Sequence, residues 1–283
     1  MAKTWTWNIL KSKRLFFLFN FVLLGLVALP LYSIAQILQL KQSLPVNKPG
    51  AISSDRLNNI YFSDQKNNIY QVSADGNLVR TYSPPTQAHV ALIEAWNLVQ
   101  IFAFYDDRQQ ITILDRFLTP LTSTRLSDLM DGNIRLATFA SDDQIWLLNE
   151  SDFTLAKVDV QHPEVKTRSQ LNQILPNSRT DFRFMREYQN NLYLIDRTSG
   201  IYIFDNLGNY KKKLPVTGLS YLGFKGDEGY YLKNNQLTFF NLYTLQEKSL
   251  PIPMQANYFQ VLVGQNTVYL FSDTTLDIYS ISN

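Results

Sequence analysis

The sequence predicts an all-β fold, a six-bladed β-propeller, and three observations carry that prediction. Beyond residue 50 the chain consists of short alternating runs bounded by Asn, Asp, Gly and Pro, which is typical of strands and tight turns. One segment recurs in a single register at an offset of 132 residues. Six similar strand starts follow one another at the spacing of propeller blades. A hydrophobic helix is expected before the ring.

The recurring segment keeps four groups of residues in one register without a gap. The first copy contains Asn58-Asn59-Ile60-Tyr61, Asp64, Ile69-Tyr70 and Gly76-Asn77. The second copy contains Asn190-Asn191-Leu192-Tyr193, Asp196, Ile201-Tyr202 and Gly208-Asn209. Self-similarity of this kind indicates a repeat architecture.

Weaker copies lie between and after these two. In every copy a strand begins with an aliphatic residue after a short turn, at Ile69, Ile111, Leu155, Ile201, Leu237 and Leu276. The intervals are 42, 44, 46, 36 and 39 residues, which fits blades of four strands. A polar residue typical of turns follows four positions later, at Ser73, Asp115, Asp159, Asp205, Asn241 and Ser280. Six copies predict six blades.

The two ends of the repeat region predict how the ring closes. The last copy stops directly after its third strand, Leu276 to Ile281, and therefore lacks an outer strand. Gln42-Ser43-Leu44-Pro45 resembles the expected outer strands at 211–215 and 248–251. We therefore expect residues 37–45 to complete the last blade, since an open propeller would expose a long unpaired edge. The alternative is that this stretch prolongs the preceding helix.

Residues 1–35 are interpreted as a signal peptide or a membrane anchor, followed by a propeller over residues 36–283. Leu15 to Ala35 carries no charge and follows the basic stretch 11–14. Pro30 and the small residues Ser33 and Ala35 favour a cleaved signal peptide, whereas an uncharged stretch of 21 residues is long enough for an anchor that spans a bilayer. Either interpretation places the propeller outside the cytoplasm, periplasmic or membrane-anchored, with membrane association through residues 15–35.

Charge and composition exclude several classes of function. Four of the 26 basic residues lie in the first 35 positions, which leaves 22 basic against 24 acidic side chains. That balance, without a long basic run, argues against nucleic-acid binding. Cysteine is absent, so disulfides and thiolate metal sites are excluded. There is no Gly-rich phosphate loop, nucleophile elbow or HExxH motif. We expect no catalytic residue, no metal site and no cofactor.

The pattern of residues 58–77, Asn-Asn-Ile-Tyr followed by Asn-x-Ile-Tyr and Asp-Gly-Asn, resembles the NHL and TolB-like six-bladed propellers. The resemblance covers residues 54–80 and 187–214 and is a likeness of fold. Such propellers include binding modules, scaffolds and a few hydrolases, so the resemblance implies a ring but no particular activity.

Two residue classes recur with the blades, and both are interpreted as structural. Short polar side chains near the turns, at Asp64, Asp106, Asn149, Asp196, Asn234 and Asp273, are expected to hold backbone turns rather than a metal ring. Aromatic residues at Tyr61, Trp146, Tyr193, Tyr231 and Tyr269 are expected to pack between blades rather than to form a binding platform. Residues 161–180 are expected to form the longest irregular connection.

The densest charged cluster supplies the candidate ligand-binding residues. Tyr105, Asp106, Asp107 and Arg108 lie together in one predicted turn, and His89 begins a predicted inner strand of the same blade. Loops on a rigid scaffold often carry binding residues. The alternative is a solvated hairpin whose Asp–Arg pair contributes little energy.

We therefore expect a non-catalytic envelope protein that binds or scaffolds, presenting one ring face to a protein or glycan partner. A calcium-type hydrolase with its site at the central channel is the second hypothesis. It requires several carboxylates and an Asn or His that converge on one point. A third is a membrane-tethered subunit of a larger complex.

Overall fold

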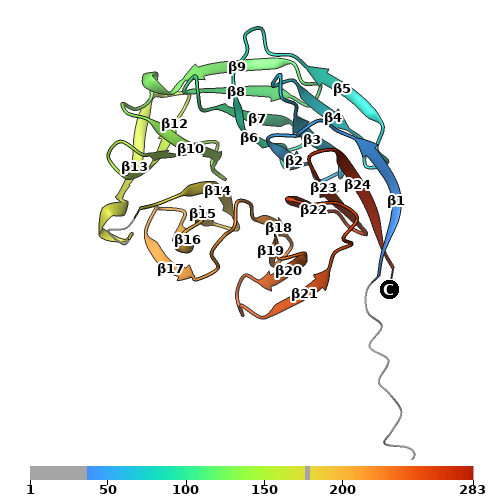
Figure 1. Ribbon diagram of the computed structural model, residues 1–283. Helices are drawn as coiled ribbons and strands as arrows, with labels where there is room; N and C mark the ends of the chain where they lie inside the picture. The colour runs from blue at the N-terminus through green and yellow to red at the C-terminus, as the bar shows by residue number, and fades with distance from the viewer. Residues whose placement is uncertain (1–36, 176–178, 283) are drawn as a thin grey trace, which may run out of the picture. The chain divides into compact units, whose positions relative to one another are not determined.

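Alternating strands and tight turns build six antiparallel sheets around a central axis (Figure 1). The computed structural model describes residues 37–175 and 179–282, and each sheet in this part has four strands. The predicted six-bladed β-propeller is therefore confirmed. We number the blades 1 to 6 along the chain and name the strands of each blade A to D from the axis outward.

The first three blades follow the chain without interruption. Their strands, A to D in each blade, are β2 (Ile52–Ser54), β3 (Ile60–Ser63), β4 (Ile69–Val72) and β5 (Leu78–Tyr82); β6 (Val90–Glu94), β7 (Gln100–Tyr105), β8 (Gln110–Asp115) and β9 (Pro120–Arg125); and β10 (Ile134–Phe139), β11 (Ile145–Asn149), β12 (Thr154–Asp159) and β13 (Glu164–Gln170). Two short 3-10 helices, η1 (Leu126–Asp128) and η2 (Leu171–Gln173), follow β9 and β13.

The last three blades repeat this order until the chain ends. Their strands are β14 (Phe182–Tyr188), β15 (Asn191–Asp196), β16 (Gly200–Asp205) and β17 (Tyr210–Leu214); β18 (Gly223–Lys225), β19 (Glu228–Lys233), β20 (Gln236–Asn241) and β21 (Glu247–Pro251); and β22 (Gln260–Val263), β23 (Thr267–Phe271) and β24 (Thr275–Ser282), with β1 (Ile37–Pro45) as the fourth strand of blade 6. All six C strands begin within one residue of the predicted starts.

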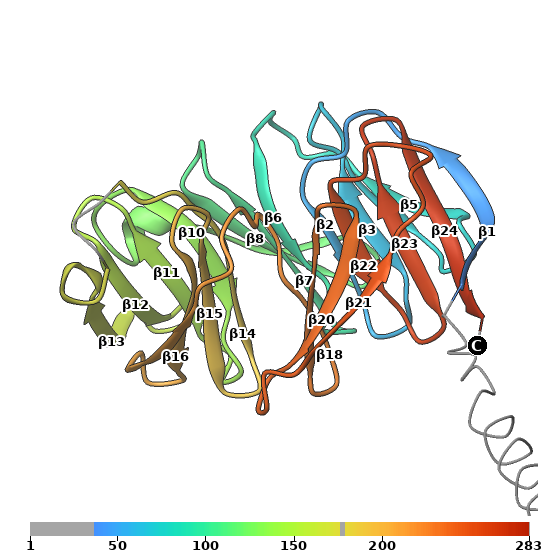
Figure 2. The same cartoon turned by 60° about the horizontal axis from the view of Figure 1, so that its bottom comes forward.

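Closure of the ring joins the two ends of the described chain. β1 pairs antiparallel with β24 from Ile37 opposite Ser282 to Pro45 opposite Thr275, with one bulge after Leu40. Both views show the two strands side by side (Figure 2). This confirms that residues 37–45 complete the last blade. The predicted helix over residues 15–35 lies outside the described residues, and no helix within the described ranges has the length and hydrophobicity needed to cross a membrane.

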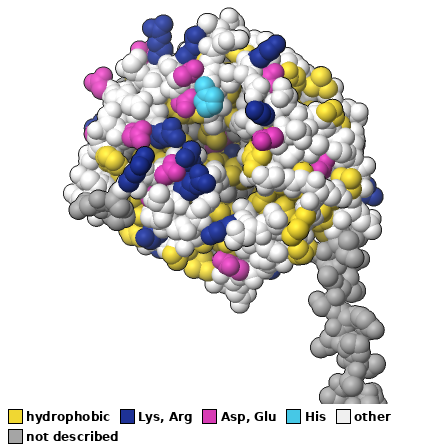
Figure 3. All heavy atoms as spheres, viewed as in Figure 1, with side chains coloured by type: hydrophobic (Ala, Val, Ile, Leu, Met, Phe, Trp, Pro, Cys, Tyr) yellow, Lys and Arg dark blue, Asp and Glu magenta, His cyan; other side chains and the backbone are white. Residues whose placement is uncertain are grey.

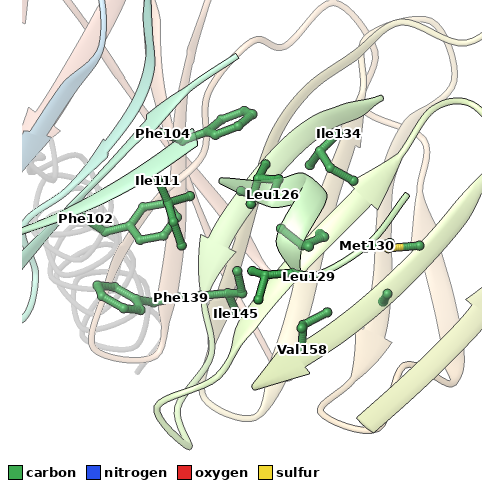
Figure 4. Close-up of a cluster of buried hydrophobic side chains, with 13 residues drawn as sticks. Phe102, Phe104, Ile111, Leu126, Leu129, Met130, Ile134, Phe139, Ile145 and Val158 are labelled. Atoms are coloured by element: carbon green, nitrogen blue, oxygen red, sulfur yellow. The ribbon is translucent and has the colours of Figure 1, made fainter. Parts of the chain in front are cut away.

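The core lies between neighbouring blades. Figure 4 shows one such layer, in which Phe102 and Ile111 of blade 2 point toward Phe139 and Ile145 of blade 3. Burial of each such side chain stabilises the ring by about 1.5–3 kcal/mol. The recurring aromatic residues are buried in these layers as predicted, with Trp146 fully buried between blades 3 and 4.

Polar side chains tie each blade to the next. Ser53 in blade 1 accepts a hydrogen bond from the Ala95 N–H of blade 2 at 3.1 Å. Gln109 of blade 2 both accepts from the Ile134 N–H (2.6 Å) and donates to the Ile134 carbonyl (2.9 Å) in blade 3. These bonds satisfy the ends of the A strands, where the sheet itself supplies no partner.

Four of the six recurring Asp and Asn residues hold turns through their side chains, as the sequence predicts. Side-chain oxygens of Asp64, Asp106, Asn149 and Asp196 accept hydrogen bonds from backbone N–H groups one or two residues later.

Two sequence expectations are wrong. Ser280 lies inside β24, opposite Gln39, rather than in a turn. Residues 164–170 form β13 rather than part of an irregular connection, because an outermost strand has few buried positions and so lacks an apolar pattern.

The carboxylates in the turns are expected to make the ring less stable at acid pH. Burial disfavours their charged forms, but hydrogen bonds, such as those from Asn68 to Asp64 and from Asn209 to Asp205, outweigh it and hold the pKa values of Asp64, Asp196 and Asp205 below their usual range. A carboxyl whose pKa is depressed by folding adds stability above its unfolded pKa, about 3.9, and loses it as the pH falls through its folded pKa.

We therefore expect the free energy of unfolding to decline below about pH 4. Urea unfolding between pH 7 and pH 2.5 measures this decline. Asp205→Asn keeps the side-chain acceptor of the turn but cannot titrate, so its decline should be shallower than that of the wild type. Identical pH profiles for the two proteins would show that Asp205 does not contribute.

Candidate functional site

A pocket of about 580 Å³ opens at one end of the ring axis. Its lining comes from all six blades, and half of its residues lie on the turns that join strands A and B. We call this end the A–B mouth. Asn58 and the pair Gln189–Asn190 occupy such turns with positive φ values of 64°, 47° and 58°. Asn adopts this left-handed backbone more readily than most residues. The turns thereby stay tight and leave the centre of the mouth open.

Glu94 lies near the axis, where its side chain contacts both blade 3 and blade 4. The carboxylate accepts hydrogen bonds from the Thr138 hydroxyl and the Phe139 N–H (3.2 Å) of blade 3. Its Oε1 also lies 3.5 Å from Nε of Arg186 in blade 4. The Glu94 side chain is fully buried, so these contacts offset the cost of removing its charge from water.

Glu187 makes a second buried carboxylate site between blades 3 and 4. Its Oε1 accepts from the Ser141 N–H (3.1 Å) and hydroxyl (2.5 Å), and its Oε2 accepts from the Trp146 indole at 2.6 Å. Lys157 Nζ lies 3.8 Å from Oε2 and is itself paired with Asp142 at 2.7 Å. Both oxygens of Glu187 are thus occupied by groups of the adjoining blade.

Asp55, which lines the pocket as Glu187 does, is held in its own turn. One oxygen accepts the N–H groups of Leu57 and Asn59, at 2.8 and 2.9 Å. The other accepts from the Asn59 amide (2.8 Å) and the Tyr61 hydroxyl (3.1 Å). Hydrogen bonds within the fold therefore occupy the acidic side chains of the mouth.

The cationic side chains of the mouth differ from one another in what they contact. Lys225 Nζ donates to the Gly264 and Gln265 carbonyls of blade 6. Arg56 is exposed and its guanidinium lies 5.6 Å from the centre of the Trp96 ring, a cation–π distance. Arg186 reaches the pocket from β14 with 12% of its side chain exposed.

Aromatic rings form one wall of the pocket. Tyr188 and Phe224 stack with ring centroids 4.6 Å apart, which joins blade 4 to blade 5. Tyr221 packs edge-on against Phe184 at 5.1 Å. Burial, together with the neighbouring phenol of Tyr221, raises the pKa of Tyr230 well above its usual value, so its hydroxyl stays neutral at physiological pH. That hydroxyl accepts the Val263 N–H at 3.1 Å.

Gly223 leaves the space that the Tyr230 ring fills behind this wall. A Cβ at position 223 would lie 2.1 Å from Cζ of Tyr230, its cross-strand partner. We expect Gly223→Ala to lower the free energy of unfolding by about 1–3 kcal/mol, because the ring has to move. The matched variant is Gly226→Ala, where no atom lies within 4 Å but φ is +55°. It should cost only about 1 kcal/mol of backbone strain. Equal losses in urea unfolding would contradict this account.

The residues predicted from the sequence lie together at the opposite end of the ring, beside a pocket of about 290 Å³. His89 Nδ1 contacts Asp106 Oδ1 at 2.7 Å, and the His89 N–H donates to Asp107 at 2.9 Å. Arg108 donates to the Gln87 carbonyl at 3.2 Å. Tyr105 departs from the group, because its side chain is buried between blades 1 and 2 and its hydroxyl has no hydrogen-bond partner among the described residues.

Figure 3 shows one face of the ring, hollowed at its centre. Charged side chains gather mainly on the left of the hollow in this view, over the blades drawn green and yellow in Figure 1. Within the two described ranges, no group of three His, Cys, Asp or Glu residues is placed to hold a metal ion.

Sequence reasoning missed Glu94, Arg186 and Glu187. Glu94 ends the otherwise apolar strand β6, and Arg186 and Glu187 directly follow the apolar residues Phe184 and Met185 in β14. A charge at such a position is costly unless it is paired. That cost is the signal that could have drawn attention to them, although it does not name their partners.

Comparison with known proteins shows the fold and nothing finer. No family model matches the sequence, and no curated protein matches it. Among solved structures, the chain is similar to streptogramin B lyase with a TM-score of 0.62 and 13% identity, over 87% of this chain and 98% of that one. It is similar to BamB from Moraxella catarrhalis with a TM-score of 0.52 and 10% identity, over 86% and 98% of the two chains.

The Pan2 WD40 domain from Neurospora crassa gives a TM-score of 0.57 and 12% identity over 84% of this chain and 90% of that one. At such identities the likeness establishes a β-propeller. The predicted fold-level resemblance to repeat propellers is thus confirmed. One fold hosts many unrelated functions, so the site has to carry the functional argument.

Proposed function

We propose that this chain is a non-catalytic binding protein of the cell envelope that presents the A–B mouth to a protein partner. One observation carries the proposal: apolar side chains stand exposed on the turns that border the pocket. Leu57 is 65% exposed, Val99 68% and Leu98 41%. They lie on the A–B turns of blades 1 and 2, next to Arg56 and Trp96 of the pocket lining.

The composition of this rim suits a protein surface. Interfaces are enriched in aromatic side chains and Arg at their centre, and contacts there contribute most of the binding free energy. Here Trp96, Tyr188 and Phe224 line the pocket together with Arg56, and the exposed apolar side chains lie on the two turns that carry Arg56 and Trp96. The blades hold the turns rigidly, so little conformational entropy is lost on binding.

The occupied carboxylates disfavour a hydrolase at this site. A general acid, a general base or a calcium ion requires carboxylate oxygens that face the substrate or the ion. Glu94, Glu187 and Asp55 instead use their oxygens within the fold. A binding role therefore agrees better with the pocket than the metal-dependent alternative.

The envelope location is supported by the apolar stretch Leu15 to Ala35 and the basic residues before it. Determination of the N-terminus of the protein purified from cell membranes tests how it is attached. Loss of the first 35 residues would indicate a cleaved signal peptide, and retention of residue 1 or 2 would indicate an anchor.

Quantitative affinity capture from detergent-solubilised envelopes tests the binding function. We expect Leu57→Ser with Val99→Ser to reduce recovery of the partner by roughly tenfold, because the two substitutions remove the most exposed apolar side chains beside the pocket and with them the apolar area that a partner would bury. The matched control is Leu78→Ser with Leu121→Ser, which changes two side chains of similar exposure (63% and 52%) on outer strands. Equal recovery with both pairs of substitutions would contradict the proposal, and recovery of a glycan instead would reassign the partner.

A further inference from the structure

Arg186 is a buried cation whose hydrogen-bonding capacity the fold leaves unused. Its guanidinium carries five N–H donors. None of them makes a hydrogen bond to any described residue, and Nε is fully buried without a partner. Its contact with Glu94 is a single approach at 3.5 Å. Buried polar groups in native proteins are almost always hydrogen-bonded, so donors left over beside a cavity require an explanation.

Glu94 does not use up this capacity. Its oxygens already accept from Thr138 and Phe139, so it offsets the charge of Arg186 without filling the donor fork. Arg186 itself lines the pocket, so its remaining N–H donors are available to a ligand there. Phe184 lies beneath the guanidinium, with Cζ 5.6 Å from its ring centroid, and limits the orientations that Arg186 can adopt.

The rest of the pocket points to the same charge of ligand. Its carboxylates are held by the fold, whereas the second guanidinium, that of Arg56, lies over the face of Trp96 and makes no hydrogen bond or ion pair with a described residue. Two guanidinium groups thus face a cavity whose acidic groups are engaged elsewhere. Guanidinium binds planar oxyanions in a bidentate manner.

We propose that the pocket at the A–B mouth binds the carboxylate of an apolar ligand through Arg186 and Arg56. The aromatic wall of Tyr188 and Phe224 takes the apolar part of that ligand. A volume of about 580 Å³ admits one bulky terminal residue or a small aromatic acid. This inference rests on the proposed binding function, and it names the chemistry that the pocket recognises.

Two sources supply such a group, the C-terminus of a partner protein and a free aromatic carboxylic acid. Matched probes separate carboxylate recognition from apolar binding: N-acetylphenylalanine and its primary amide. A hexapeptide ending in the same residue, with a free or an amidated C-terminus, separates the two sources. Each probe is titrated calorimetrically into the full-length protein at pH 7.

We expect the affinity for each acid that binds to be at least roughly tenfold higher than the affinity for its amide. A hydrogen bond to a charged group contributes more free energy than a hydrogen bond to a neutral group. Arg56→Gln should reduce this ratio without affecting folding, because the side chain is exposed. Glu94→Gln with Arg186→Gln removes both charges of the buried pair together, which avoids an unpaired charge, and should abolish the ratio. Arg125→Gln, an exposed change on β9, is the control and should leave it unchanged.

Equal affinity for acid and amide would overturn the inference, as would an acid-to-amide ratio unaffected by either Arg substitution, or no binding of any probe. Binding of both peptide forms with equal affinity would overturn carboxylate recognition while preserving a protein-binding function. Binding of the small acid but not the peptide acid would support the inference and assign the free acid as the source. Loss of the proposed function is detected separately, by the capture experiment with the Leu57 and Val99 variants.

Discussion

A chain that lacks residues 37–45 is expected to lose most of its stability. β1 is the outer strand of blade 6, and eight of its residues pair with β24. A net contribution of about 0.5–1.5 kcal/mol for each hydrogen bond makes this loss comparable with the whole free energy of unfolding of a typical domain, about 5–15 kcal/mol. Ser43 also donates to Asp277, whose other oxygen accepts from the buried Tyr258 hydroxyl.

Deletion would leave β24 as an exposed edge from Thr275 onward, so aggregation should accompany the loss of stability. Circular dichroism during thermal unfolding, with light scattering, measures both effects. The matched control moves residues 37–45 to the C-terminus, joined after Asn283 by a short flexible linker, which restores the strand on a different connection. If the deletion variant unfolded cooperatively and at the same temperature as the wild type, pairing of the two chain ends would not be what holds the ring together.

Glu187→Ala is expected to lower the free energy of unfolding by about 3–5 kcal/mol, the range for a buried pair that loses one partner. The substitution removes the acceptor for the Trp146 indole and for Ser141, and it leaves Lys157 only 5% exposed with one carboxylate fewer. Asp142 and the Asn206 carbonyl still bind Lys157, which limits the loss.

Glu187→Gln is the matched variant. It keeps the size of the side chain and one acceptor oxygen, so we expect a smaller loss than for the alanine variant. Chemical denaturation followed by circular dichroism measures both losses. Equal effects of the two substitutions would mean that the negative charge and the second acceptor oxygen, which both variants lack, determine the stability at this position, and that the size of the side chain and its remaining acceptor do not.

The architecture could be predicted because its signals are local and repeated. Each C strand is flanked by turns, and short polar side chains such as Asp115 and Asp205 mark where it ends. The closing strand was predictable from its likeness to other outer strands and from the missing strand of the last blade. Outer strands such as β13 have few buried residues, so their sequences carry little strand signal, and the sequence therefore predicts a loop at residues 164–170 where the structure has a strand.

The candidate site at the A–B mouth could not be predicted, because its residues meet only after the ring closes. Glu94 and Arg186 are 92 positions apart and lie in blades that are not neighbours. No spacing rule relates them. The cluster around His89 and Asp106 lies within one blade, which is why sequence reasoning found it. The local density of charge in the sequence therefore points to the end of the ring that carries His89. The pocket with Arg186 lies at the other end.

Site-specific photo-crosslinking from the two ends of the ring tests the central claim most directly. A photoreactive amino acid is placed at Val99 on the A–B mouth, or at Arg108 at the opposite end, in the full-length protein expressed in its own cells. We predict that position 99 yields a discrete crosslinked partner, which the Leu57→Ser substitution weakens, and that position 108 does not. A partner that crosslinks from position 108 and not from position 99 would contradict the account and assign binding to the face that carries His89.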